Sequence, residues 1–250
     1  MWSGKAPQKL SRWLTLCRLS ASLSGRLLNF DVEYLSGQSL RLLYDEIFAR
    51  EEYLFESSTL QPVIYDCGAN IGMATLFFKW LYPESTVVSF EADPTSFNVL
   101  KRNIEKNRLR GVSAHNIALW NEDGHIPFFV REDEPGSLLM STIASRTSGK
   151  EILVEAKRLS SFIAGRVDLL KLDVEGAEVK VIRDLLESGK IDSVQQMIIE
   201  YHHHISNESR SRLGTFLEML EQNGWNYQLS SWCFPNARDI FQDVHIYAYR

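Results

Sequence analysis

The chain has 250 residues, 44% of them hydrophobic, so it can bury one substantial core and need not be divided into two domains. Its formal net charge of -5 and isoelectric point near 5.7 argue against broad, sequence-independent binding of nucleic acid, which depends on a basic face. The three cysteines are scattered and form no C-x-x-C pair, which argues against a disulfide framework or a zinc site and favours a reducing, cytoplasmic setting.

The N-terminal segment differs in character from the rest of the chain. Residues 1–30 contain five basic residues and no acidic one, and apolar side chains recur at helical spacing from Leu10 to Ala21, which predicts a basic amphipathic helix. Such a helix fits peripheral contact with a membrane, an organelle transit peptide, or simple packing over the domain that follows. We expect an extension over residues 1–52, with a short helix at 39–50, and one domain over 53–250.

A strand, a glycine turn and a helix are predicted between residues 63 and 81. Residues 63–65 form a short β-branched run that is typical of a buried strand, and the run stops at Asp66. Gly68 and Gly72 follow, and a residue without a Cβ allows the backbone to approach a ligand or a neighbouring strand closely. Residues 71–81 are apolar enough to continue as a buried helix. This order is typical of a nucleoside-binding loop.

The second predicted strand, residues 86–90, ends at Glu91. An acidic residue there, about 20 residues after the glycine turn, is placed to accept hydrogen bonds from both hydroxyls of a ribose. Counting G-x-G-x-x-G from Gly68 puts Asn70 and Met73 where glycines belong, which argues against a dinucleotide. No G-K-[ST] follows the turn, which argues against a phosphate-binding P-loop.

The remaining pattern, D-x-G-x-N-x-G from Asp66 to Gly72 together with Glu91, resembles the cofactor loop of S-adenosylmethionine-dependent methyltransferases. That cofactor has no pyrophosphate, so the loop has to host only its amino acid end. We therefore expect Asp66 and backbone carbonyl groups to face the ammonium group of the cofactor. The alternative is that Asp66 only caps the helix and that the glycines only make a tight turn.

Strands and helices alternate along the rest of the chain. The predicted strands are residues 112–116, 167–173, 194–200, 225–229 and 244–249, and the predicted helices are 94–107, 177–188 and 208–223. Such alternation predicts an α/β fold with a mostly parallel sheet. The resemblance to methyltransferases that use this cofactor implies a Rossmann-like sheet of seven strands that ends in an antiparallel C-terminal pair. Residues 121–157 insert a predicted hairpin of 126–130 and 152–156, and residues 134–142 are either a lid over the substrate or only the hairpin tip.

The second strong motif is D-L-L-K-L-D-V-E-G-A-E at residues 168–178. A buried parallel strand delivers Asp173 and Glu175 to its C-terminal end, where ligands bind in open α/β sheets, and Gly176 allows the turn into the next helix. Together with D-x-G-A-N-x-G and the I-I-E-Y-H that ends at His202, this motif resembles the FkbM family of S-adenosylmethionine-dependent methyltransferases. The resemblance runs from about residue 53 to residue 202.

The resemblance implies a cofactor site and an acceptor. The implied cofactor-binding residues are Asp66, Gly68, Ala69, Asn70, Gly72, Glu91, Ala92, Asn116, Ala118 and Asp173, with the adenine flanked near Ala118 and Leu119. Asp173 is expected beside the transferable methyl group. Members of this family methylate hydroxyl oxygens of sugars or of polyketide and related natural products, which implies a small-molecule or glycan hydroxyl acceptor. Two alternatives stay open: a methyltransferase for RNA or protein, and a noncatalytic module that binds S-adenosylmethionine.

The candidate catalytic residues are Asp173, Glu175, Glu200 and His202. A hydroxyl acceptor has a pKa far above 7, so it benefits from a base or a metal that takes its proton as the methyl group transfers. Histidine suits base chemistry near neutrality. If the strand continues, Glu200, His202 and His204 point to one side next to Asp173, so a metal site is geometrically possible. We do not predict one, because no ligand motif of known spacing is satisfied.

Overall fold

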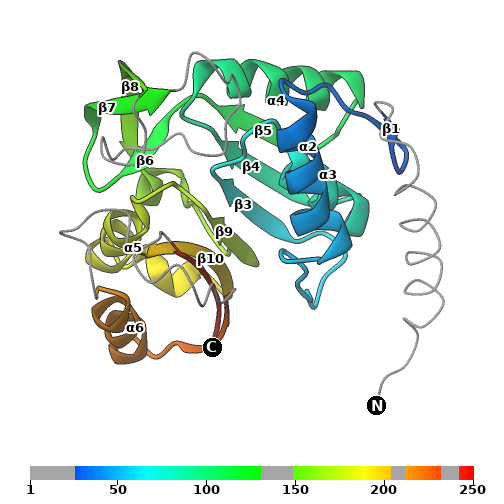
Figure 1. Cartoon of the computed structure of the whole chain (residues 1–250). Helices are drawn as coiled ribbons and strands as arrows, with labels where there is room; N and C mark the ends of the chain where they lie inside the picture. Colours follow the sequence, from blue (N-terminus) through cyan, green and yellow to red (C-terminus); the bar gives the residue numbers. More distant parts are fainter. Residues whose placement is uncertain (1–25, 131–148, 204–211, 232–241) are drawn as a thin grey trace.

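The structure is a computed structural model, and it describes residues 26–130, 149–203, 212–231 and 242–250 (Figure 1). The amphipathic helix predicted in the first 25 residues, the predicted lid at 134–142, His204 and the start of the predicted helix 208–223 lie outside the described residues. Over the described ranges, no helix is long and apolar enough to cross a membrane.

In the described part of the chain, seven strands form the central sheet. Its order is β11-β12-β10-β9-β3-β4-β5, and every strand is parallel to the others except β12, which runs antiparallel to both neighbours. The strands are β3 (Val63–Cys67), β4 (Thr86–Phe90), β5 (Val112–His115), β9 (Leu169–Leu172), β10 (Gln196–His203), β11 (Asn226–Ser231) and β12 (Gln242–Tyr249). The predicted Rossmann-like α/β fold and its antiparallel C-terminal pair are confirmed.

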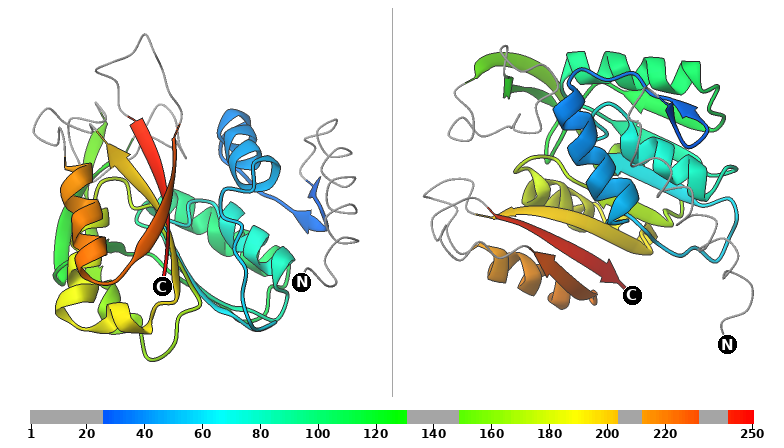
Figure 2. Two further views of the ribbon diagram at one scale, coloured as in Figure 1. Left: turned by 90° about the horizontal axis from the view of Figure 1, so that it is seen from below. Right: turned by 45° about the vertical axis from the view of Figure 1, so that its right-hand side comes forward.

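Helices cover both faces of this sheet. They are α2 (Gly37–Tyr44), α3 (Met73–Leu81), α4 (Pro94–Lys106), α5 (Glu178–Glu187) and α6 (Leu213–Gln222), with short 3-10 turns η3 (Leu159–Phe162) and η4 (Lys190–Ser193). Figure 2 shows α5 and α6 on one side of the sheet and α2, α3 and α4 on the other. Because side chains alternate along a strand, Ile64 belongs to the core cluster of α3, and Tyr65 belongs to the core cluster of α5.

A smaller sheet lies beside the central one (Figure 1). Within the described residues its order is β6-β8-β7, formed by β6 (Ala118–Trp120), β7 (Gly124–Val130) and β8 (Lys150–Arg158). The predicted hairpin is confirmed, since β7 and β8 pair antiparallel with Ile126 opposite Val154. Sequence patterns did not reveal β6, which pairs parallel with β8, because three residues are too short a run to show a period.

The residues before position 52 share a core with the rest of the chain. Val32, Tyr44 and Phe48 are buried in the cluster that contains Phe77 of α3, and the rings of Phe48 and Phe77 meet edge to face with centroids 5.2 Å apart. The single helix predicted at 39–50 consists of α2 and a π-helical turn, η1 (Asp45–Ala49). The boundary predicted between residues 52 and 53 therefore coincides with no gap in the packing. A ribbon of β1 (Arg26–Leu27) and β2 (Phe30–Asp31) precedes this segment.

Candidate active site

The loop between β3 and α3 is shaped by its neighbours. Gly68 has a φ of +80°, and a Cβ added there would lie 1.7 Å from the backbone oxygen of Asp173, which follows β9. Gly72 has a φ of +92°, and its Cβ would lie 2.7 Å from the side chain of Leu100. Residues with a Cβ rarely adopt such backbone φ angles, so both positions favour glycine on conformational and on steric grounds. Gly68 thereby brings the loop against the strand end that carries Asp173.

Glu91 ties this loop to the tip of β4. Its Oε2 accepts a hydrogen bond from the backbone N–H of Asn70 at 2.7 Å, and its Oε1 accepts one from the N–H of Asp93 at 2.8 Å. Burial raises the pKa of Glu91 to about 7, although the two backbone donors favour the carboxylate. The acid predicted to bind a ribose is therefore one whose charge changes near neutrality.

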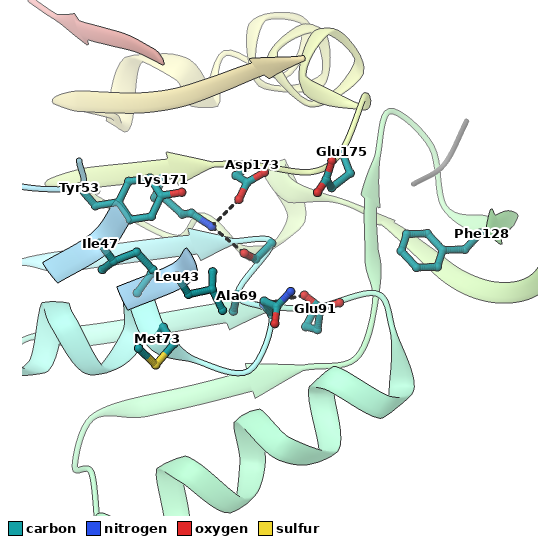
Figure 3. Close-up of a pocket in the computed structure, with 13 residues that line it drawn as sticks. Leu43, Ile47, Tyr53, Ala69, Met73, Glu91, Phe128, Lys171, Asp173 and Glu175 are labelled. Atoms are coloured by element: carbon teal, nitrogen blue, oxygen red, sulfur yellow. Dashed lines mark hydrogen bonds and ion pairs between the residues drawn. The ribbon is translucent and has the colours of Figure 1, made fainter. Parts of the chain in front are cut away.

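A cavity lies between the glycine loop, the end of β9 and α2 (Figure 3). The predicted cofactor residues in its walls are Gly68, Ala69, Asn70, Glu91 and Asp173. An adjoining cavity shares three of these residues and is lined in addition by Ala92, Ala118 and Leu119. Phe128 of β7 lines both cavities, so the smaller sheet contributes an aromatic wall. The fold thus brings most of the predicted cofactor residues together.

The other predicted cofactor residues, Asp66, Gly72 and Asn116, are not among the lining residues of these cavities. Asn116 donates from Nδ2 to the backbone oxygens of Glu91 and Ala92, at 2.8 and 3.1 Å, and so supports the tip of β4. Asp66 is fully buried, and its Oδ2 accepts a hydrogen bond from the Thr75 hydroxyl at 2.7 Å. The carboxylate of Asp66 has no exposed surface and lines neither cavity, and its predicted contact with the cofactor stays a prediction.

Lys171 contacts the groups that were predicted to face the ammonium group of the cofactor, Asp66 and a backbone carbonyl of the glycine loop. Its Nζ donates to the backbone oxygen of Gly68 at 2.6 Å and lies 3.5 Å from Oδ1 of Asp66, its direct neighbour across β3 and β9. The same Nζ lies 3.2 Å from Oδ2 of Asp173 (Figure 3). Burial alone would lower the pKa of Lys171, but Asp173 and Asp66 raise it above its ordinary value. The lysine therefore stays charged and holds the loop, both aspartates and the end of β9 together.

The four predicted catalytic residues meet around one imidazole. Nε2 of His202 lies 2.9 Å from Oε2 of Glu175, 3.7 Å from Oδ1 of Asp173 and 4.0 Å from Oε1 of Glu200. On the other side of the ring, Nδ1 lies 2.8 Å from Oε1 of Glu178. The side chain of His202 is only 1% exposed, so this ring is fixed in place. We call Asp173, Glu175, Glu200 and His202 the histidine–acid cluster.

Strand β12 adds partners that the sequence did not reveal. Asp243 lies directly opposite His202 on β10 and places its Oδ1 3.8 Å from Nε2. His245 lies opposite Glu200, and its Nε2 is 3.4 Å from Oε2 of that residue. Oε2 of Glu200 also accepts a hydrogen bond from the Tyr53 hydroxyl at 3.2 Å. The cluster lies on β10 and on the chain that follows β9, and β12 and the segment that leads into β3 supply its further contacts.

Charges within the cluster shift the pKa values of two of its carboxyl groups in opposite directions. Burial and the nearby Glu200 raise the pKa of Asp173 above its ordinary value. Burial alone would also raise the pKa of Glu200, but the hydrogen bond with His245 and the nearby His202 lower it to about 2. Glu200 is thus a fixed negative charge, whereas Asp173 holds a proton more readily. Groups with such unequal proton affinities suit the transfer of a proton.

The family model described as Methyltransferase FkbM domain matches residues 66–229, a span that contains the glycine loop, Glu91 and the histidine–acid cluster. This chain belongs to the FkbM methyltransferase family. It is therefore an S-adenosylmethionine-dependent methyltransferase of the FkbM type, and the predicted family is confirmed.

Relatives of this FkbM-type methyltransferase match most of its length. Methyltransferase 1 of Beauveria bassiana (strain ARSEF 2860) is 30% identical over 222 residues, which cover 80% of this chain and 87% of the relative. The 31-O-demethyl-FK506 methyltransferase FkbM of Streptomyces tacrolimicus is 28% identical over 232 residues, which cover 78% of this chain and 85% of the relative. A crystal structure of a methyltransferase FkbM from Methylobacillus flagellatus KT matches with a TM-score of 0.51 and 15% sequence identity. The match covers 98% of this chain and 60% of the other, and at this identity it shows similarity of fold alone.

In this FkbM-type methyltransferase, the segment before β3 supplies an apolar wall of the cavity. Leu43 comes from α2, Ile47 from the π-helical turn η1, and Tyr53 from the chain that follows (Figure 3). Single π-helical turns are frequent at functional sites. These apolar side chains line the same cavity as Asp173 and Glu175.

Proposed function

We propose that this FkbM-type methyltransferase transfers the methyl group of S-adenosylmethionine to a hydroxyl oxygen of a sugar, a glycan or a natural product. The observation that carries the proposal is the histidine–acid cluster, which meets the cavity at Asp173 and Glu175. An alcohol is a weak nucleophile unless its proton is removed as the methyl group transfers. A group of carboxylates around a fixed imidazole supplies acceptors for that proton.

The cavity walls suit the cofactor that the family uses. Glu91 is a carboxylate at the tip of β4, and strand-tip acids of this kind bind ribose hydroxyls. Ala118, Leu119 and Phe128 form apolar walls that suit the faces of an adenine ring. The cofactor, when bound, supplies the methyl group to the acceptor oxygen. Gly68, held by Lys171, and Asp173 lie at the end of the cavity nearest the cluster, where we place the amino acid end and the methyl group.

The residues of the chain then orient the acceptor and exclude water. Leu43 and Ile47 pack against its carbon skeleton, and the cluster binds the reacting hydroxyl and takes its proton. Positioning supplies much of the rate in a methyl transfer, because the oxygen has to approach the methyl carbon in line. The rigid setting of His202, between Glu178 and Glu175, supports such positioning.

The relatives support an oxygen acceptor. The name of the Streptomyces tacrolimicus relative states that it acts on 31-O-demethyl-FK506, a compound that lacks a methyl group on oxygen. The negative charge of the cluster and of the whole chain is less suited to RNA, whose phosphates need basic contacts.

Methyl transfer from S-adenosylmethionine to panels of sugars, glycosides and hydroxylated natural products tests the proposal. We expect His202→Gln and Asp173→Asn each to lower turnover of the accepted substrate by about 10²–10⁴-fold, the usual contribution of a general base. Calorimetry should find binding of S-adenosylhomocysteine nearly unchanged in both variants, and Glu105→Gln, an exposed substitution on α4, serves as the control. Wild-type turnover in both variants would remove the cluster from the mechanism, and transfer to nitrogen alone would contradict the acceptor class.

A further inference from the structure

Several electron-pair donors of the cluster point toward one another around His202. Glu178 also accepts a hydrogen bond from the N–H of Gly176, so it acts as an acceptor, and Nδ1 of His202 is the donor toward it. In the neutral ring, Nε2 then carries a lone pair. This lone pair faces carboxylate oxygens of Asp173 and Glu175, which are also electron-pair donors. Such an arrangement is repulsive unless a proton or a metal cation lies between the atoms.

Neighbouring residues hold the side chains in this orientation. Oδ2 of Asp173 pairs with Lys171, and its Oδ1 faces His202. Nδ1 of His202 is bound to Glu178, and its Nε2 faces the carboxylates. In metal sites, a second layer of hydrogen bonds of this kind, above all from a carboxylate to the far nitrogen of a histidine, fixes the tautomer and aims the ligand atoms. The cluster has this layer built in.

The distances are compatible with the spacing of ligands around one ion. Two ligands that each lie about 2.1 Å from a metal are separated by roughly 3–4 Å. Nε2 of His202 lies 2.9 Å from Glu175 and 3.7 Å from Asp173, and the three donor atoms all lie within 4.8 Å of one another. The longer of these two contacts exceeds hydrogen-bond distance.

We propose that Asp173, Glu175 and His202 bind one divalent metal cation. One imidazole and two carboxylates form a donor set that suits Mn²⁺, Fe²⁺ or Zn²⁺. A second group, Glu200, His202 and Asp243, shares the imidazole. We favour the first group because Asp173 and Glu175 line the cavity, so the ion has access from it. The position also deepens the proposed function, on which this role rests: a cation there binds the acceptor hydroxyl and makes it more acidic.

Electron paramagnetic resonance of Mn²⁺ tests the site directly. Titration of metal-free, full-length protein with Mn²⁺ should remove one equivalent of the free-ion signal per chain. Asp173→Asn and Glu175→Gln should each weaken binding by at least about tenfold, and Glu178→Gln, which touches only the far side of the imidazole, by about tenfold. Asp192→Asn replaces an exposed carboxylate that pairs with Arg250 far from the cavity, so it should bind Mn²⁺ like the wild type.

Three results would overturn the inference. One is no loss of signal with wild-type protein at millimolar Mn²⁺, which would mean that a protonated His202 balances the carboxylates. Another is wild-type affinity in Asp173→Asn and Glu175→Gln. The third is a loss confined to Asp243→Asn, which would move the ion to the other group. Because the readout is metal binding, failure of the methyl-transfer assay would remove the proposed function without touching the site.

Discussion

At the scale of single residues, Lys171 joins the glycine loop to the end of the cavity that Asp173 lines. It binds the backbone oxygen of Gly68 and pairs with Asp66 and Asp173 inside the sheet. Removing one partner of a buried ion pair leaves an uncompensated charge, so Lys171→Met should lower the free energy of unfolding in urea by about 3–5 kcal/mol. The double variant Lys171→Met, Asp66→Asn should recover part of that loss. A single variant as stable as the wild type would contradict this role.

We expect Glu91 to make cofactor binding depend on pH. Its pKa is about 7 in the unliganded protein, so it is mostly protonated below that pH and mostly a carboxylate above it. If ribose binding needs the carboxylate, affinity for S-adenosylhomocysteine should rise as the pH rises, by about tenfold between pH 6 and pH 8. Calorimetry over this range should find a flat profile in Glu91→Gln. A profile in that variant as steep as in the wild type would assign the titration to another group.

Many residues that line the cavity were predictable from the sequence, but the contacts between residues far apart in the chain were not. The order of strand, glycine loop and acid identified Gly68 and Glu91, because local geometry and local sequence coincide there. Lys171 was detectable in principle, since a charge inside the apolar run L-L-K-L needs a partner. Asp243 and His245 were not, because their approach to β10 depends on the register of two strands more than 40 residues apart.

At the scale of elements, the contact between the glycine loop and the end of β9 is the tightest constraint at the site. A Cβ on Gly68 would overlap the backbone oxygen of Asp173, and the φ angle disfavours any side chain. We expect Gly68→Ala to lower stability by several kcal/mol or to prevent folding. The control is Gly214→Ala within α6, where an added Cβ meets nothing within 4 Å. This control should gain about 0.5–1 kcal/mol in urea unfolding, and equal effects at the two positions would contradict the argument.

Elements with a clear period were predictable, and those formed by tertiary pairing were not. Strand β4 and helix α4 match their predicted ranges closely, because an apolar run and the Asp93 cap with Pro94 define them locally. Strand β6 and the π-helical form of η1, which lies within the helix predicted at 39–50, were missed, because each is short and depends on packing against its neighbours. The wall that η1 contributes to the cavity was therefore missed with it.

At the scale of the whole molecule, the basic N-terminal segment precedes the described part of the chain. The first buried residue of the described core is Val32, and we expect a chain that lacks residues 1–25 to fold. Packing over the domain is the simplest role for the segment, and we expect full-length and shortened chains to pellet equally with anionic liposomes. Preferential pelleting of the full-length chain would show membrane attachment instead.

Calorimetric titration with S-adenosylmethionine and S-adenosylhomocysteine, on the wild type and on Glu91→Ala, tests the account of this molecule most directly. NADH is the control ligand, because the glycine loop lacks the dinucleotide pattern. We expect S-adenosylmethionine and S-adenosylhomocysteine to bind the wild type with micromolar affinity, and NADH not to bind. Glu91→Ala should lose this binding while circular dichroism shows that its fold is intact. Absence of binding by the wild type, or undiminished binding by Glu91→Ala, would contradict the proposed position of the cofactor. It would also contradict the proposal that methyl transfer takes place beside the histidine–acid cluster.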